Sequence, residues 1–316
     1  MGEPLRVVFM GSAELACASL EALVACDGMN VVAVVTQPDK PAGRKLQPQP
    51  SPVKRLATKL GLPVLQPVSL RDPQAFAQLQ ALAPQLVVVA AYGQILPAAV
   101  LNLPLHGCLN IHTSLLPKYR GAAPIQSALL NGDAETGVTL MKMDAGLDTG
   151  DIVATVATPL APDETAQTLH DRLAQLGAQL LLASLPDFLS GKIRPQPQPA
   201  TGASYAAKIK KEDGRIDWSQ SAHVLDRRIR AFTPWPGAFT DLPVPTQRLL
   251  KVRTAAVVDA FGEPGRVLDA EGAGPLVACS EQALRLLWVQ REGGQWMSGA
   301  EFLRGCPLQV GQQLGA

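Results

Sequence analysis

The chain lacks paired cysteines and long apolar runs, and each of these absences excludes a class of protein; its net charge is only +1. Its five cysteines form no CxxC pair and no metal-ligand spacing, so we expect no disulfide framework, no metal site and a reducing compartment. No apolar run reaches 18 residues, and no charged leader precedes a long apolar segment, so we expect a cytoplasmic protein. The initial Met-Gly is not a myristoylation signal, because Arg6 stands where that signal needs Ser or Thr.

Phosphate-binding loops are also missing. The GSAEL segment at 11–15 follows an apolar run but lacks the GxGxxG pattern, and GxxxxGK[ST] occurs nowhere. We therefore expect neither dinucleotide binding nor nucleotide hydrolysis.

A chain of 316 residues is long enough for two domains. Its residues are 47% hydrophobic and only 17% charged, which is typical of globular proteins. Through the first half, short β-branched runs alternate with helical patterns, which predicts a Rossmann-like, doubly wound and mostly parallel α/β sheet over residues 1–190. Strands are expected at 5–11, 30–37, 63–66, 85–93, 107–113, 135–144 and 152–158, and helices at 13–25, 52–60, 72–83 and 164–189.

The remainder of the chain has a different composition. In residues 191–207 proline alternates with polar residues, which predicts a semi-rigid linker. Residues 208–316 contain a helical pattern at 222–232 and then short strands separated by glycine and proline. This pattern predicts a small OB-like β-barrel domain.

The fifth expected strand contains a polar pair, Asn110 and His112. Because residues two apart in a strand face the same way, their side chains should project together at the carboxyl edge of the sheet, where doubly wound sheets bind ligands. An amide and an imidazole aimed at one oxygen can stabilise an oxyanion. The chain has only four histidines, which favours a functional role over that of a polar strand end.

Spacing leaves the partner of this pair open. Asp148 lies in the turn MDAGLDTGD and could orient the imidazole, but Asp144 and Asp151 compete with it, and acids in such turns are often caps. Cys108, on the same face, raises the alternative of a Cys-His-Asp acyl-transfer enzyme. A buried free cysteine is more often a small hydrophobic residue.

Five segments in order resemble the methionyl-tRNA formyltransferase family, which uses 10-formyltetrahydrofolate as co-substrate. They are TQPDKPAGRKL, VVAAYGQILP, NIHTSLLPKYRGAAPI, MKMDAGLDTGD and RIRAFTPWPGA. The resemblance implies a formyltransferase fold, a metal-free transfer of formyl to the amine of initiator methionyl-tRNA, and Asn110, His112 and Asp148 as the catalytic trio. It further implies folate contacts at Ser114, Leu115, Leu116, Pro117, Gln94, Ile95 and Leu96.

The trio does not identify the acceptor amine, because related enzymes formylate amino-sugar nucleotides. Two segments help: 37–59 carries six Lys or Arg against one acid, and 208–253 carries ten against five. The resemblance implies that a loop after the second strand and the start of the second domain bind tRNA through Lys40, Arg44, Lys45, Lys208, Lys210 and Lys211. We also expect a monomer. The GRKLQPQPSP stretch and the GSAEL turn both depart from the family pattern.

Overall fold

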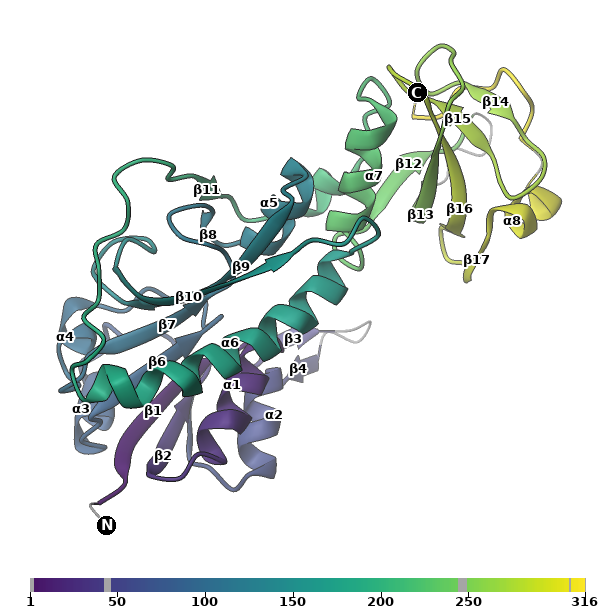
Figure 1. The fold of residues 1–316 in the computed structure, drawn as a ribbon. Coiled ribbons are helices and arrows are strands. Elements are labelled where there is room, and N and C mark those ends of the chain that lie inside the picture. Colours follow the sequence, from purple (N-terminus) through teal and green to yellow (C-terminus); the bar gives the residue numbers. More distant parts are fainter. Residues whose placement is uncertain (1–2, 43–46, 244–248, 307, 316) are drawn as a thin grey trace. The chain divides into compact units, whose positions relative to one another are not determined.

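The computed structural model describes residues 3–42, 47–243, 249–306 and 308–315. They divide into two compact units (Figure 1). Unit 1 comprises 1–124, 135–159 and 170–207, and unit 2 comprises 125–134, 160–169 and 208–316. Arg44 and Lys45, predicted to contact tRNA, lie outside the described residues.

A seven-stranded sheet forms the centre of unit 1, in the order β10-β9-β7-β6-β1-β2-β5. The five strands from β7 to β5 are parallel, whereas β9 runs antiparallel to both of its neighbours. This arrangement confirms the Rossmann-like, mostly parallel sheet. The strands are β1 (Leu5–Gly11), β2 (Met29–Val35), β5 (Val64–Leu65), β6 (Leu86–Ala90), β7 (Cys108–His112), β9 (Glu135–Lys142) and β10 (Asp151–Pro159).

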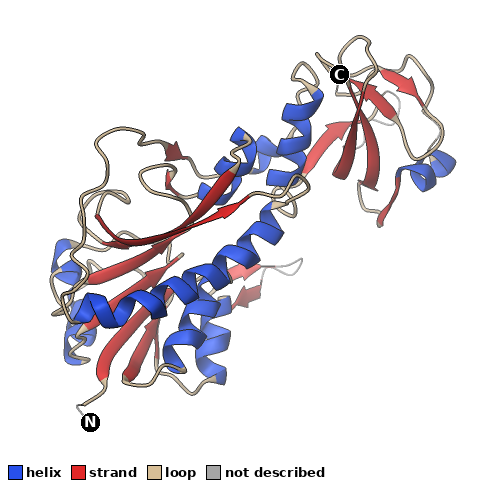
Figure 2. Cartoon of the chain, in the orientation of Figure 1, coloured by secondary structure: helices blue, strands red, loops and turns tan. Residues whose placement is uncertain are grey.

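Helices cover both faces of this sheet (Figure 2). Two of them begin with a capping side chain followed by proline: Ser51 accepts from the amide of Lys54, and Asp72 from that of Gln74. The helices are α1 (Leu15–Val24), α2 (Pro52–Lys59), α3 (Pro73–Ala81), α4 (Ala98–Leu101) and α6 (Ala166–Leu189), whose first turn belongs to unit 2.

The two faces of β7 have different neighbours. Gly177 of α6 lies against Ile111: a Cβ at position 177 would lie 2.7 Å from Cγ2 of Ile111, too close for a larger residue without a shift. On the opposite face, Cys108 joins an apolar cluster that includes Leu79 of α3 and Val100 of α4. Asn110 and His112 share the face of Cys108 and lie beyond it, toward the carboxyl edge.

Two small strand pairs complete unit 1: β3 (Lys40–Ala42) pairs antiparallel with β4 (Gln47–Gln49), and β8 (Arg120–Gly121) pairs parallel with β11 (Tyr205–Ala206). Of the second pair, β11 lies within 191–207, the segment predicted to be a semi-rigid linker. This segment pairs through its backbone with the rest of unit 1, at Gln196 with Ile152 and at β11.

Unit 2 is built on an antiparallel sheet of six strands, in the order β12-β13-β16-β15-β14 with β17 paired to β16. This confirms a second domain of antiparallel strands. The elements are α5 (Pro124–Asn131, from its second residue), the 3-10 helix η1 (Lys211–Gly214), α7 (Ala222–Ala231), β12 (Ala238–Asp241), β13 (Leu249–Val258), β14 (Val267–Asp269), β15 (Leu276–Ala278), β16 (Ala283–Arg291), β17 (Trp296–Ser298) and α8 (Gly299–Gly305).

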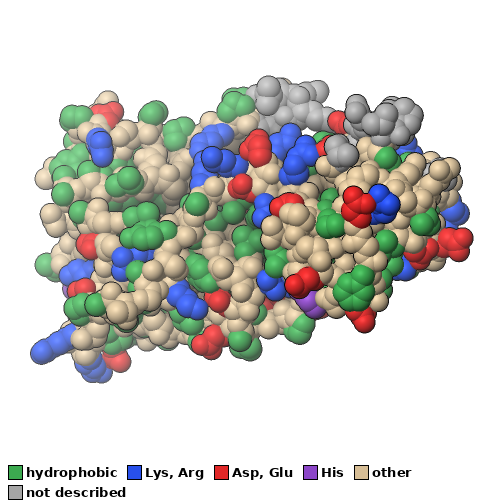
Figure 3. All heavy atoms as spheres, turned by 90° about the horizontal axis from the view of Figure 1, so that it is seen from above, with side chains coloured by type: hydrophobic (Ala, Val, Ile, Leu, Met, Phe, Trp, Pro, Cys, Tyr) green, Lys and Arg blue, Asp and Glu red, His purple; other side chains and the backbone are tan. Residues whose placement is uncertain are grey.

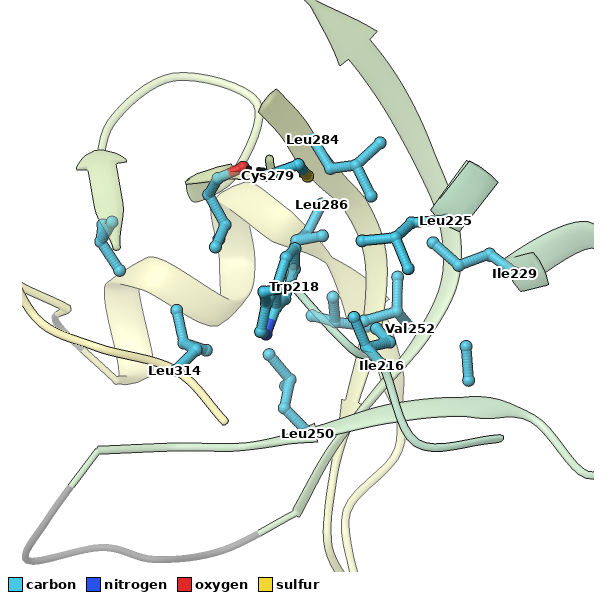
Figure 4. Close-up of a cluster of buried hydrophobic side chains, with 14 of the residues drawn as sticks. Ile216, Trp218, Leu225, Ile229, Leu250, Val252, Cys279, Leu284, Leu286 and Leu314 are labelled. Atoms are coloured by element: carbon cyan, nitrogen blue, oxygen red, sulfur yellow. Dashed lines mark hydrogen bonds between the residues drawn. The ribbon is translucent and has the colours of Figure 1, made fainter. Parts of the chain in front are cut away.

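The core of unit 2 is a cluster around Trp218 (Figure 4), with Leu225 and Ile229 of α7 facing Leu250 and Val252 of β13. The indole N–H of Trp218 donates to Thr240 at 3.0 Å, which satisfies a buried polar group. None of the described helices in either unit is both long and apolar enough to cross a bilayer.

Candidate active site

Asn110 and His112 end strand β7 between two neighbours, β6 on one side and β9 on the other. Asn110 is in register with Val89 of β6 and Met141 of β9, and His112 is in register with Thr139 of β9. Their relative exposures are 9% and 6%. The structure thus brings the predicted pair together at the carboxyl edge of the parallel strands.

The two side chains differ in how they are held. The Asn110 amide makes no hydrogen bond with any described residue, so its N–H groups remain available to a ligand. The Nε2 atom of His112 lies 2.9 Å from the carbonyl oxygen of Tyr119. Because a carbonyl oxygen can only accept a hydrogen bond, Nε2 is the donor in this contact, and Nδ1 is the ring nitrogen that faces Asp148.

Asp148 is the acid that faces this imidazole. Its Oδ2 lies 3.8 Å from His112 Nδ1, which is within electrostatic range and longer than a direct hydrogen bond. The same oxygen accepts from the amide of Gly121 at 2.8 Å, and the backbone of Asp148 is left-handed, with φ of 51°. The carboxylate is therefore fixed by the loop that follows β7 as well as by its own turn.

The competing acids are both exposed. Asp144 is exposed and accepts from the Gly146 amide and from the Thr149 hydroxyl, which makes it the capping residue of the turn. Asp151 is exposed at the start of β10. Gly150 allows the turn to close, because a Cβ there would lie 1.9 Å from the carbonyl oxygen of Lys142.

Cys108 does not fit the role of a nucleophile. Its side chain is 1% exposed, its sulfur lies 3.7 Å from the carbonyl oxygen of Val100, and burial raises the pKa of its thiol to about 12. A thiol in this state carries almost no thiolate at neutral pH. The acyl-transfer alternative therefore loses its reactive group.

The SLLP turn leaves β7 and is fixed by a residue that the sequence analysis does not identify. The Thr139 hydroxyl donates to the carbonyl of Ser114 at 2.7 Å and accepts from the amide of Leu116 at 3.0 Å. Ser114 also donates to the carbonyl of Lys118. Thr139 is fully buried. In the sequence, the feature that could have identified it is a hydroxyl side chain inside a strand that is otherwise mostly apolar.

Residues 94–96, predicted to hold the folate, differ in how far their side chains are buried. Ile95 is 76% exposed, Leu96 is 4% exposed within the core cluster, and Gln94 donates to the carbonyl of Pro67. They follow β6, the parallel neighbour of β7, so they leave the sheet at the same edge as the SLLP turn. Any ligand contact of Leu96 would involve its backbone.

The described lysines predicted to contact tRNA are all exposed. Lys40 donates to Gln37 at the base of the β3–β4 hairpin in unit 1. In unit 2, three further lysines make no ion pair with any described residue: Lys208, Lys210 and Lys211. On the face drawn in Figure 3, Lys and Arg side chains lie among acidic and uncharged ones.

Metal binding would need a cluster of suitable side chains. Within the described ranges no group of three or more His, Cys, Asp or Glu is arranged to hold a metal ion.

The fold, the paired donors and the fixed carboxylate define a class of protein. The profile of the formyl transferase family matches residues 5–185, and the profile of the formyl transferase C-terminal domain matches residues 208–307. The chain belongs to the formyl transferase family.

Relatives that span nearly the whole chain are more specific. The chain is 50% identical to the methionyl-tRNA formyltransferase of Aromatoleum aromaticum over 99% of its own length and 98% of the relative's. It is 51% identical to the enzyme of the same name from Myxococcus xanthus, over 98% and 97%. The resemblance drawn from the motifs is confirmed.

Solved structures of lower identity share the fold. WlaRD, a sugar 3N-formyl transferase, superposes with a TM-score of 0.65 at 18% identity, covering 93% of this chain and all of that one. HypX from Aquifex aeolicus, solved with tetrahydrofolic acid, gives 0.62 at 18% identity; the match covers 95% of this chain and about half (47%) of HypX.

Proposed function

We propose that this chain transfers the formyl group of 10-formyltetrahydrofolate to the α-amino group of initiator methionyl-tRNA, giving N-formylmethionyl-tRNA. One observation supports methionyl-tRNA as the acceptor: over both domains, about half of the residues are identical to those of enzymes named methionyl-tRNA formyltransferase. The reaction itself is supported by the geometry of Asn110, His112 and Asp148, which we assign as the catalytic residues.

The amine nitrogen attacks the formyl carbon, and the formyl oxygen gains negative charge as the tetrahedral intermediate forms. The free amide of Asn110 donates to this oxygen. A protonated His112 is the second donor. Its Nδ1 carries the donating proton, because Nε2 is engaged by the Tyr119 carbonyl.

Asp148 stabilises the imidazolium across the 3.8 Å that separates Oδ2 from Nδ1. When the intermediate collapses, the bond between the formyl carbon and N10 of the folate breaks, and N10 is protonated. The amine gives up one proton in exchange, and His112 and Asp148 are the groups positioned to relay it. No enzyme-bound acyl intermediate is needed, which agrees with the buried state of Cys108.

We assign the folate to the edge formed by the SLLP turn and residues 94–96. The Thr139 hydroxyl bonds to the Ser114 carbonyl and to the Leu116 amide of the turn. These two bonds hold the turn in one conformation, in which it can bind a ligand. Exposed Ile95 supplies apolar area beside it. For tRNA we assign phosphate contacts to exposed lysines in each unit taken by itself: Lys40 in unit 1, and Lys208, Lys210 and Lys211 in unit 2.

Incubation with 10-formyltetrahydrofolate and charged initiator tRNA tests the proposal, with formyl-methionine as the measured product. Asn110→Ala should reduce kcat on the order of 100- to 1000-fold, because one oxyanion donor is lost. Wild-type product with an amino-sugar nucleotide, and none with tRNA, would reassign the acceptor and leave the catalytic assignment intact.

A further inference from the structure

Gln198 lies where three segments of unit 1 meet, although it belongs to the proline-rich stretch that composition predicts to be a spacer. Its Nε2 donates to two carbonyl oxygens of the acidic turn, those of Asp148 and Gly150, each at 2.8 Å. Its Oε1 accepts from Arg120, at 3.1 Å from Nε and 2.7 Å from Nη2. One amide side chain thereby joins the turn of Asp148 to the loop after β7.

The residues that follow Gln198 hold the same loop. The Tyr119 amide donates to the Ser204 hydroxyl at 2.9 Å, the Arg120 amide to the Ser204 carbonyl at 2.8 Å, and the Ala122 amide to the Ala206 carbonyl at 2.9 Å. Figure 1 shows β11 beside β8 as a result. We call residues 198–206 the strap.

The loop held by the strap supplies the direct partners of both ionisable catalytic groups. The Tyr119 carbonyl accepts a hydrogen bond from His112 Nε2, and the Gly121 amide donates one to Asp148 Oδ2. Gly121 has a φ of 113°, and a Cβ at this position would lie 2.7 Å from the Ala206 carbonyl oxygen, so strap and loop are in close contact. The relative position of imidazole and carboxylate therefore depends on where the strap holds this loop.

We propose that Gln198 is a positioning residue for formyl transfer: it fixes the Asp148 turn against residues 119–121, so that the carboxylate faces His112 Nδ1. This inference rests on the proposed function for its effect on rate. The hydrogen bonds of Gln198 to the turn do not depend on it and can be measured separately.

Two variants of Gln198 and one control test the inference in the full-length protein. Gln198→Glu keeps an acceptor for Arg120 but replaces the amide N–H groups by oxygen opposite two carbonyls. Gln198→Met removes both interactions at similar size. Gln196→Ala is the control, because the exposed Gln196 side chain donates within the same stretch, to the Arg194 carbonyl, and its pairing with Ile152 is through the backbone.

Both Gln198 variants should lower kcat on the order of 10- to 100-fold, the size expected for misplacing a reacting group by about 1 Å. KM for the folate should be unchanged, because the hydrogen bonds of the Gln198 side chain go to Arg120, Asp148 and Gly150 and not to the SLLP turn. Hydrogen exchange at the Gly121 amide, which donates to Asp148, should become several-fold faster in both variants and stay at the wild-type rate in the control.

A merely structural role would lower the melting temperature and leave kcat and Gly121 exchange unchanged; this result would overturn the inference. Loss of kcat with Gly121 exchange unchanged would also overturn it. If the wild-type protein formylates no methionyl-tRNA, the proposed function fails, and Gly121 exchange still decides whether Gln198 holds the Asp148 turn.

Discussion

Replacing Asp148 with asparagine removes one negative charge and keeps the shape of the side chain. Asparagine can still accept from the Gly121 amide, so the turn should keep its conformation. The lost quantity is the attraction between the carboxylate and the imidazolium, whose atoms lie 3.8 Å apart with side chains 15% and 7% exposed. At an effective dielectric constant of about 20, unit charges at this separation attract by about 4 kcal/mol.

If this attraction operates in full in the transition state, Asp148→Asn should reduce kcat by about three orders of magnitude, since about 1.4 kcal/mol corresponds to a factor of ten. Single-turnover formylation with saturating folate and charged tRNA measures the chemical step directly. Asp144→Asn is the matched control, because Asp144 lies in the same turn, is exposed, and its side chain accepts hydrogen bonds from Gly146 and Thr149 of that turn. A folded Asp148→Asn protein within threefold of the wild-type kcat would refute the assignment of this charge.

Three further predictions concern groups beside the catalytic trio. Thr139→Val should cost about 1–3 kcal/mol of unfolding free energy, because a buried amide loses its acceptor, and should raise KM for the folate; urea denaturation and steady-state kinetics measure both. Cys108→Ala should retain kcat, and inactivation of the folded variant would restore the thiol mechanism. Because burial raises the pKa of the wild-type thiol to about 12, that thiol should be protonated at pH 8 and should resist iodoacetamide. Alanine at Lys208, Lys210 and Lys211 should weaken tRNA binding and reduce the slope of log affinity against log salt by about 1 for each lysine that contacts a phosphate; an unchanged slope would place the tRNA elsewhere.

The sequence predicts the position of the donor pair because two local rules suffice. Strand periodicity places Asn110 and His112 on one face, and the alternation of strands and helices places β7 among parallel neighbours. The direction of β9 is not available from such rules. Its six consecutive residues 136–141 are all buried, as in a parallel strand covered on both faces, although β9 pairs antiparallel on both sides.

The residues that hold the loops beside His112 and Asp148 were not predictable in this way. Gln198 and Ser204 are polar residues in a proline-rich stretch, and composition alone predicts that such a stretch is a solvated spacer. Their partners lie about 50 and 85 positions earlier in the chain, so no local spacing connects them. The resemblance singles out Asp148 from Asp144 and Asp151, but it does not explain that choice; the contact with the Gly121 amide does.

The strap also has a consequence for the order in which the protein is assembled. A chain made from its N-terminus releases β7, the SLLP turn and the Asp148 turn well before residues 198–206 exist. Until then Tyr119 lacks its Ser204 partner, 85 residues ahead, and closing a loop of that length is slow compared with forming local structure. The sheet can therefore form early, whereas the geometry of the imidazole and carboxylate is completed only after residues 198–206 have been made.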